Sequence, residues 1–153
     1  MPSVSVTSPS LTSLSLTSLS LTSLSFTKLA YAEMIGNAYD GYPLEACGLL
    51  VGKGTKVHRF VACTNEAASA RVYTIPGREL LRAEIAAEDE GLEIIGVFHS
   101  HTHSEPYPSP TDVAQAPDPG WFYVIVSLKR EAPEARCYRI VDGTIAEVPI
   151  SLG

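Results

Sequence analysis

The chain has 153 residues, 45% hydrophobic and 18% charged, which favours one domain with a buried core. The formal net charge is -6, and the 11 Lys and Arg residues form no cluster, which excludes a typical nucleic-acid-binding surface or a basic patch for acidic membranes. No apolar run approaches the roughly 18 residues that a membrane-spanning helix needs. Three scattered cysteines do not make a disulfide framework and indicate a cytoplasmic protein.

The first 25 residues differ in composition from the rest. They contain no charged residue, and LTSLS occurs three times in tandem, at 11–15, 16–20 and 21–25. The segment lacks the basic start and the continuous apolar run of a signal peptide. We interpret residues 1–25 as a disordered extension, with an amphipathic strand as the alternative, and residues 26–153 as the folded domain.

Periodicity and turn residues predict the elements of this domain. A helix capped by Thr27 is expected to run through about Asp40, and a second helix is expected over about 78–91. Strands are expected on both sides of a turn at 52–54, then at 93–99, 121–128, 135–141 and 144–150. The predicted core-facing helix residues are Leu29, Ala30, Met34, Ile35 and Ala38 in the first helix and Leu80, Leu81, Ile85 and Leu92 in the second. The pattern predicts a single-domain α/β fold, a mixed sheet of about five or six strands flanked by two main helices.

Three of the four histidines lie within five residues. The apolar run 94–98 predicts a strand, so His99 and His101 would point to one face. With Asp112 after a turn they would form a three-ligand site with one position open to water, as in catalytic zinc sites. Adventitious metal binding by a His-rich tract is the alternative. His103 precedes a turn-like sequence, so we expect it outside the ligand set or solvated.

Ser109 and Asp112 also have a structural interpretation. Ser109-Pro110-Thr111-Asp112 is typical of a helix start that ends by Ala116, with Ser109 as N-cap and an acid at N3. A capping role and a metal role are compatible, because a carboxylate has two oxygens.

A hydrolytic zinc site also needs a proton acceptor. Glu45 is the candidate, because it precedes an otherwise apolar strand, although an exposed strand end explains it equally well. Cys47 lies close to this candidate, but a nucleophilic cysteine needs a histidine partner, and the histidines are better explained as metal ligands. Cys47, Cys63 and Cys137 are expected to be buried small hydrophobic residues.

The combined pattern resembles a known motif. Glu45, His99-Ser100-His101, Ser109 after seven residues and Asp112 after two more are similar to the JAMM motif of the MPN-domain metallopeptidases. The resemblance covers roughly 26–150. It implies a cytidine-deaminase-like fold, zinc on His99, His101 and Asp112, Glu45 as general base and acid, and Ser109 as an oxyanion donor.

Three segments, EACGLL, HSHTHSEPYPSPTDV and CYRIVDG, are similar to a bacterial branch of that family typified by actinobacterial hydrolases of sulfur-carrier protein–cysteine conjugates. This resemblance implies cleavage between the C-terminal glycine of a ubiquitin-like sulfur-carrier protein and an added cysteine. A broader peptidase or isopeptidase on ubiquitin-like or small peptide substrates is the nearest alternative. The others are a two-histidine, one-carboxylate iron oxygenase and a non-catalytic module that binds a ubiquitin-like tail.

Overall fold

The computed structural model describes residues 23–153, so most of the expected extension lies outside the described residues. The end of that segment is not an extension. Leu24–Phe26 form a short strand, β2, and both Leu24 and Phe26 are fully buried. The boundary predicted at residue 26 is therefore two residues late, because the Leu-Ser-Phe alternation places two apolar side chains on the core face of a strand.

The described elements form one mixed eight-stranded sheet with three helices. The strand order is β8-β7-β6-β5-β3-β4-β2-β9, and the pairs β5–β6, β2–β4 and β2–β9 are parallel. After β2 the elements are α2 (Lys28–Gly41), β3 (Cys47–Lys53), β4 (Lys56–Cys63), α3 (Gly77–Asp89), β5 (Glu93–His101), α4 (Pro110–Ala114), β6 (Phe122–Ser127), β7 (Glu134–Val141), β8 (Thr144–Val148) and β9 (Ile150–Leu152).

The α/β class is confirmed, whereas the expected number of strands, five or six, was too low. One reason is β2, which falls in the repeat segment. The other is Pro149, which lies between β8 and β9 where one strand was expected over 144–150. Proline has no N–H to donate to a ladder, so it interrupts the pairing.

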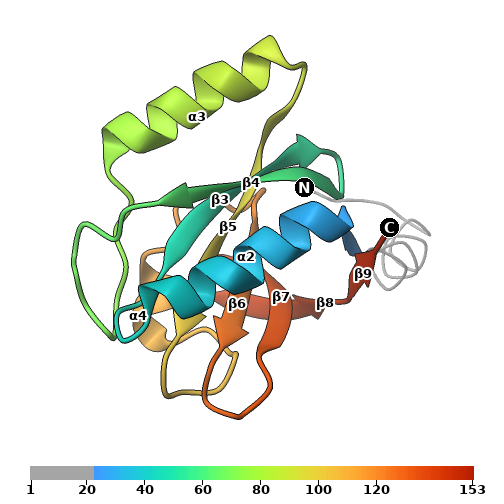
Figure 1. Ribbon diagram of the computed structural model, residues 1–153. Helices are drawn as coiled ribbons and strands as arrows, with labels where there is room; N and C mark the ends of the chain where they lie inside the picture. The colour runs from blue at the N-terminus through green and yellow to red at the C-terminus, as the bar shows by residue number, and fades with distance from the viewer. Residues whose placement is uncertain (1–22) are drawn as a thin grey trace.

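Helices α2 and α3 lie on opposite faces of the sheet (Figure 1). Alternating residues of the central strands supply the two cores. Leu50 and Phe98 belong to the core with α2, and Leu49 and Val97 belong to the core with α3. His99 follows Val97 by two residues, so it points to the α3 face of the sheet.

Both helices contact the sheet mainly through alanines, joined by Met34 in α2, which corrects part of the predicted stripes. Helix α2 buries Ala30, Met34 and Ala38 as expected, but Leu29 is 70% exposed. Helix α3 buries alanines, and Leu81 and Ile85 are 57% and 54% exposed. Periodicity located the helices correctly, but it did not show which of two adjacent apolar positions meets the sheet. None of the helices within 23–153 is long and apolar enough to cross a membrane.

Candidate metal centre

Three side chains converge where strand β5 ends. His99 Nε2 lies 3.3 Å from His101 Nε2 and 3.2 Å from Asp112 Oδ2, and His101 Nε2 lies 3.1 Å from the same oxygen. The three side chains are at most 6% exposed. They form a candidate metal-binding cluster. The alternation of β5 places the two histidines on one face, as the sequence predicts, and α4 brings the carboxylate to them.

These separations fit a tetrahedral zinc ion. Zinc binds His nitrogen and carboxylate oxygen at about 2.0–2.2 Å, so two ligand atoms at a tetrahedral angle lie about 3.3 Å apart. The observed separations are 3.1 to 3.3 Å. Three protein ligands also leave a fourth position for water or substrate, which is the arrangement of catalytic rather than structural zinc.

A backbone carbonyl orients His101. Its Nδ1 lies 2.7 Å from the carbonyl oxygen of Glu105, which only accepts, so this nitrogen carries the proton. In the neutral ring Nε2 then presents a lone pair to the cluster. Burial lowers the pKa of His101, but hydrogen bonds with Asp112 and the Glu105 carbonyl outweigh it, and the net direction is upward.

His99 is oriented differently. Tyr73 stacks on the His99 ring, with the ring centroids 4.4 Å apart and an interplanar angle of 18°. Among the residues described, His99 Nδ1 has no hydrogen-bond partner. Burial lowers the pKa of His99, which favours the neutral form that binds metals. Sequence reasoning missed Tyr73, because it lies in the irregular segment between β4 and α3. An aromatic residue in a loop of small and polar residues was the available signal.

The two expected roles of Asp112 coexist. Ser109 caps α4, since its Oγ accepts from the Asp112 N–H at 3.0 Å, and Asp112 Oδ2 accepts from the Ser109 N–H at 2.9 Å. The same Oδ2 faces both histidines. Burial raises the pKa of Asp112, but hydrogen bonds with His101 and His99 lower it well below its ordinary value, so the group is a carboxylate.

Glu45 is buried, not an exposed strand end. It is 3% exposed, and its Oε1 has no hydrogen-bond partner within residues 23–153. Strand β3 pairs Cys47 with His99, and the Ser100 N–H donates to the Ala46 carbonyl at 3.0 Å. If the register continues two residues beyond Cys47, Glu45 faces His101 on the side of the metal ligands, and both His101 and Asp112 act on its pKa. Burial raises its pKa to about 7, with His101 lowering it and Asp112 raising it further.

His103 lies outside the cluster. Its side chain is exposed, and its Nε2 lies 3.3 Å from the hydroxyl of Tyr42. Cys47 is fully buried, and burial raises the pKa of its thiol to about 12, which makes it unsuitable as a nucleophile at neutral pH. Cys137 is also buried, whereas Cys63 is partly exposed at a cavity wall.

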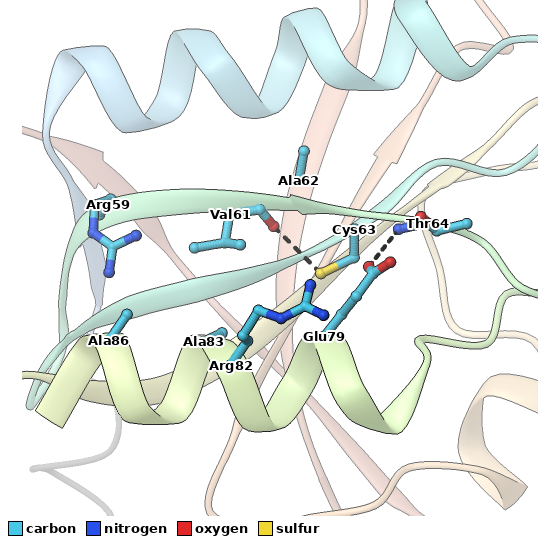
Figure 2. A pocket seen from close by; sticks show the side chains of 9 residues that line it. All are labelled: Arg59, Val61, Ala62, Cys63, Thr64, Glu79, Arg82, Ala83 and Ala86. Atoms are coloured by element: carbon cyan, nitrogen blue, oxygen red, sulfur yellow. Dashed lines mark hydrogen bonds between the residues drawn. The ribbon is translucent and has the colours of Figure 1, made fainter.

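Residues of α3 help to line several hollows. An apolar one of about 350 Å³ adjoins the metal centre, because Tyr73, Val97 and Gln115 line it together with Trp121. Another, of about 590 Å³, lies between β4 and α3 (Figure 2). There the Glu79 carboxylate accepts from the Thr64 N–H at 2.8 Å, near the side chains of Cys63 and Arg82. This second hollow includes none of the candidate metal ligands.

Comparison with known proteins gives the family. Residues 27–141 match the model of prokaryotic homologs of the JAB domain. The chain belongs to the prokaryotic JAB family of JAMM-type metallopeptidases. It is 38% identical over 122 residues to the CysO-cysteine peptidase of Mycobacterium tuberculosis, covering 78% of this chain and 84% of that protein. This membership favours a hydrolase over the iron-oxygenase alternative.

The chain is also similar to two further proteins. The desampylase of Haloferax volcanii is 37% identical over 91 residues, which is 56% of this chain and 63% of that protein. A crystal structure of a JAB1/MPN domain protein from Archaeoglobus fulgidus superposes with a TM-score of 0.57, covering 84% of this chain and 99% of the other. Its identity is 18%, so it supports the shared fold alone, which confirms the MPN fold that the motif implies.

Proposed function

We propose that the protein is a zinc-dependent hydrolase that releases cysteine from the C-terminal glycine of a ubiquitin-like sulfur-carrier protein. The observation that carries the proposal is the convergence of His99, His101 and Asp112 within 3.3 Å of one another, with Glu45 buried two residues before the Cys47–His99 register pair. The 38% identity to a CysO-cysteine peptidase over most of both chains supports this choice of substrate. The free thiols of the described domain suit a reducing cytoplasm.

In this proposal three protein ligands hold the zinc ion, and Glu45 moves the proton. Zinc would polarise the scissile carbonyl and lower the pKa of a water molecule to about 7. Glu45 accepts a proton from the attacking water and delivers it to the nitrogen of the departing cysteine as the carbon–nitrogen bond breaks. Its raised pKa suits both steps, since a group with a pKa near 7 both accepts and donates at neutral pH.

Ser109 is proposed to stabilise the developing oxyanion. Its Oγ accepts a hydrogen bond from the Asp112 N–H, which leaves the hydroxyl hydrogen for a donor role. In the capping box the Asp112 carboxylate accepts from the Ser109 N–H, so the Ser109 hydroxyl is held in place before the reaction starts.

The apolar hollow beside the centre suits an extended protein tail. Tyr73 connects the hollow to the metal centre, because it stacks on His99 and lines the hollow with Val97 and Trp121. An apolar side chain of the carrier tail would occupy this hollow while the terminal glycine reaches the metal ligands.

The second candidate is an isopeptidase that removes ubiquitin-like proteins from other proteins. The similarity to the desampylase of Haloferax volcanii favours it, although that match spans only 56% of this chain. Both candidates share the same catalytic groups and differ in what leaves the terminal glycine. The choice between them therefore depends on the substrate rather than on the centre.

Two substrates separate the candidates. The protein is incubated with a carrier that ends in glycine plus one cysteine, and with the same carrier joined to a lysine side chain. We expect faster cleavage of the cysteine adduct, loss of activity with a chelator and recovery when Zn²⁺ is added. Cleavage of the lysine conjugate alone would assign the isopeptidase function, and full activity in chelator would contradict both.

A further inference from the structure

The turn Ser104–Pro106, which follows His101, is tied to three adjacent strands. The Ser104 carbonyl accepts a hydrogen bond from Ser127 Oγ of β6 at 2.6 Å, and the Pro106 carbonyl accepts one from the hydroxyl of Tyr138 on β7. Between them, the Glu105 carbonyl accepts from His101 Nδ1 of β5 at 2.7 Å. Three consecutive carbonyls thus each accept a hydrogen bond from a side chain of a different strand.

The two outer donors are buried. Ser127 and Tyr138 are 1% and 2% exposed. Ser127 ends the otherwise apolar strand β6 and is the register partner of His101 in the parallel β5–β6 pair. A buried hydroxyl without a partner costs free energy, so the hydrogen bond to the turn explains how a polar residue is accommodated there.

The middle carbonyl has little freedom to move. It accepts from the Tyr107 N–H at 2.8 Å in addition to His101 Nδ1, so both of its lone pairs are engaged. The position of this oxygen sets the direction of the His101 ring and keeps the proton on Nδ1. The chain that leaves the turn leads to Asp112, so a displaced turn would move two metal ligands together.

We propose that Ser127 and Tyr138 are positioning residues of the metal centre, which hold the Glu105 carbonyl against His101. This inference rests on the proposed function in that His101 binds zinc. The side chain of Glu105 is not the anchor. It pairs with Lys129 and Arg130 at about half-exposed positions, where ion pairs are screened by water and contribute little.

The test is the zinc affinity of Tyr138→Phe and Ser127→Ala, measured by competition with a chromophoric chelator. We expect each variant to bind Zn²⁺ about 10- to 100-fold more weakly than wild type, the usual effect of losing a partner behind a metal-bound histidine. The visible absorption of the Co²⁺-loaded variants should also shift, because the ligand field depends on the direction of the His101 ring. Glu105→Ala keeps the backbone carbonyl, so its affinity should stay within about twofold of wild type.

Tyr123→Phe is the matched control. The Tyr123 hydroxyl is also a buried group that donates to a loop carbonyl, that of Asp118 at 2.6 Å, but Asp118 is not part of the metal centre. Tyr123→Phe and Tyr138→Phe should both lower the Tm of the metal-free protein, but Tyr123→Phe should leave the Zn²⁺ affinity and the Co²⁺ absorption unchanged.

The outcomes are distinct. Wild-type-like Zn²⁺ affinity and Co²⁺ spectra in Tyr138→Phe or Ser127→Ala would overturn the inference and leave the proposed function intact. Absence of Zn²⁺ binding by the wild type would overturn both. The two variants remove different donors to the same turn, so either one that folds, as judged by circular dichroism, decides the question.

Discussion

Ser100 and Ala46 exchange two hydrogen bonds: the Ser100 N–H donates to the Ala46 carbonyl at 3.0 Å, and the Ala46 N–H donates to Ser100 Oγ at 2.8 Å. Ala46 follows the proposed proton acceptor Glu45 in the sequence, and Ser100 lies between the proposed metal ligands His99 and His101. The pair therefore fixes the position of Glu45 relative to the end of β5 that carries His99 and His101.

Removing the Ser100 hydroxyl should separate catalysis from metal binding. In Ser100→Ala the buried Ala46 N–H loses its acceptor, which should cost about 1–3 kcal/mol of stability. Glu45 becomes less well held, so kcat should fall about 10-fold or more while zinc content stays that of wild type. Steady-state kinetics and metal analysis of the same sample check this, and an unchanged kcat would show that the pair serves folding alone.

Glu45 should lower the stability of the metal-free protein. Its folded pKa of about 7 lies above its ordinary 4.5, so the fold prefers the protonated acid. Glu45 has no effect on the free energy of unfolding below pH 4.5. Its destabilising effect grows as Glu45 ionises in the unfolded chain and is complete above pH 7. Glu45→Gln should therefore be more stable than wild type by up to about 3 kcal/mol above pH 7 and equal to it below pH 4.5. Urea unfolding at both pH values measures the difference.

The same titration should appear in turnover. Glu45 acts as a base only when ionised, so kcat/KM should rise with pH through an inflection at or below 7, because the charge of bound zinc lowers the pKa of a nearby carboxyl group. The kcat of Glu45→Gln should be about 10²- to 10⁴-fold lower than that of the wild type, and its zinc content should be unchanged. An inflection that persists in residual Glu45→Gln activity would assign the titration to another group.

Asp112→Asn should separate capping from metal binding. The amide oxygen still faces the Ser109 N–H, and Ser109 still caps the helix, so stability should fall by about 1 kcal/mol. The charge that binds the ion is gone, so zinc content and turnover should be lost together. A variant with full zinc and wild-type turnover would make Asp112 a helix cap and nothing more.

Cys47→Ala should remain active. The thiol is fully buried with a pKa of about 12, and it contributes packing rather than a nucleophile. We expect wild-type kcat/KM and a loss of about 1 kcal/mol from the small cavity. Complete loss of turnover in zinc-loaded Cys47→Ala would indicate cysteine catalysis instead.

Two truncations test where the folded domain begins. A chain that starts at Ser23 should have the Tm and activity of the 153-residue chain. A chain that starts at Thr27 keeps the N-cap of α2 but loses the buried Leu24 and Phe26, each worth about 1.5–3 kcal/mol. It should unfold at a clearly lower temperature, and equal melting curves would show that β2 contributes nothing.

Local sequence rules predicted the parts of the candidate site that depend on local geometry. Alternation places His99 and His101 on one face, and Ser109-Pro110 with Asp112 forms the predicted capping box. Glu45 was open to two interpretations, because its burial depends on pairing between β3 and β5 across about fifty residues. Only the three-dimensional register distinguishes a buried acid from an exposed strand end.

The residues that sequence reasoning misplaced depend on tertiary contacts. Tyr73 reaches His99 from an irregular loop that Asn65 holds through hydrogen bonds to three carbonyls, including that of Glu45. Leu29 and Leu81 follow helical periodicity but face solvent, because alanines set the contact with the sheet. Composition alone assigned Leu24 to the repeat, although it is buried.

The most direct test of the proposed function is the mass of a carrier protein that ends in glycine plus one cysteine, measured after incubation with the zinc-loaded enzyme. We expect the wild type to lower the carrier mass by one cysteine residue and to release an equal amount of free cysteine. Zinc-loaded Glu45→Gln should leave the carrier unchanged over the same time. An unchanged carrier with the wild type, or equal cleavage by both proteins, would contradict the account.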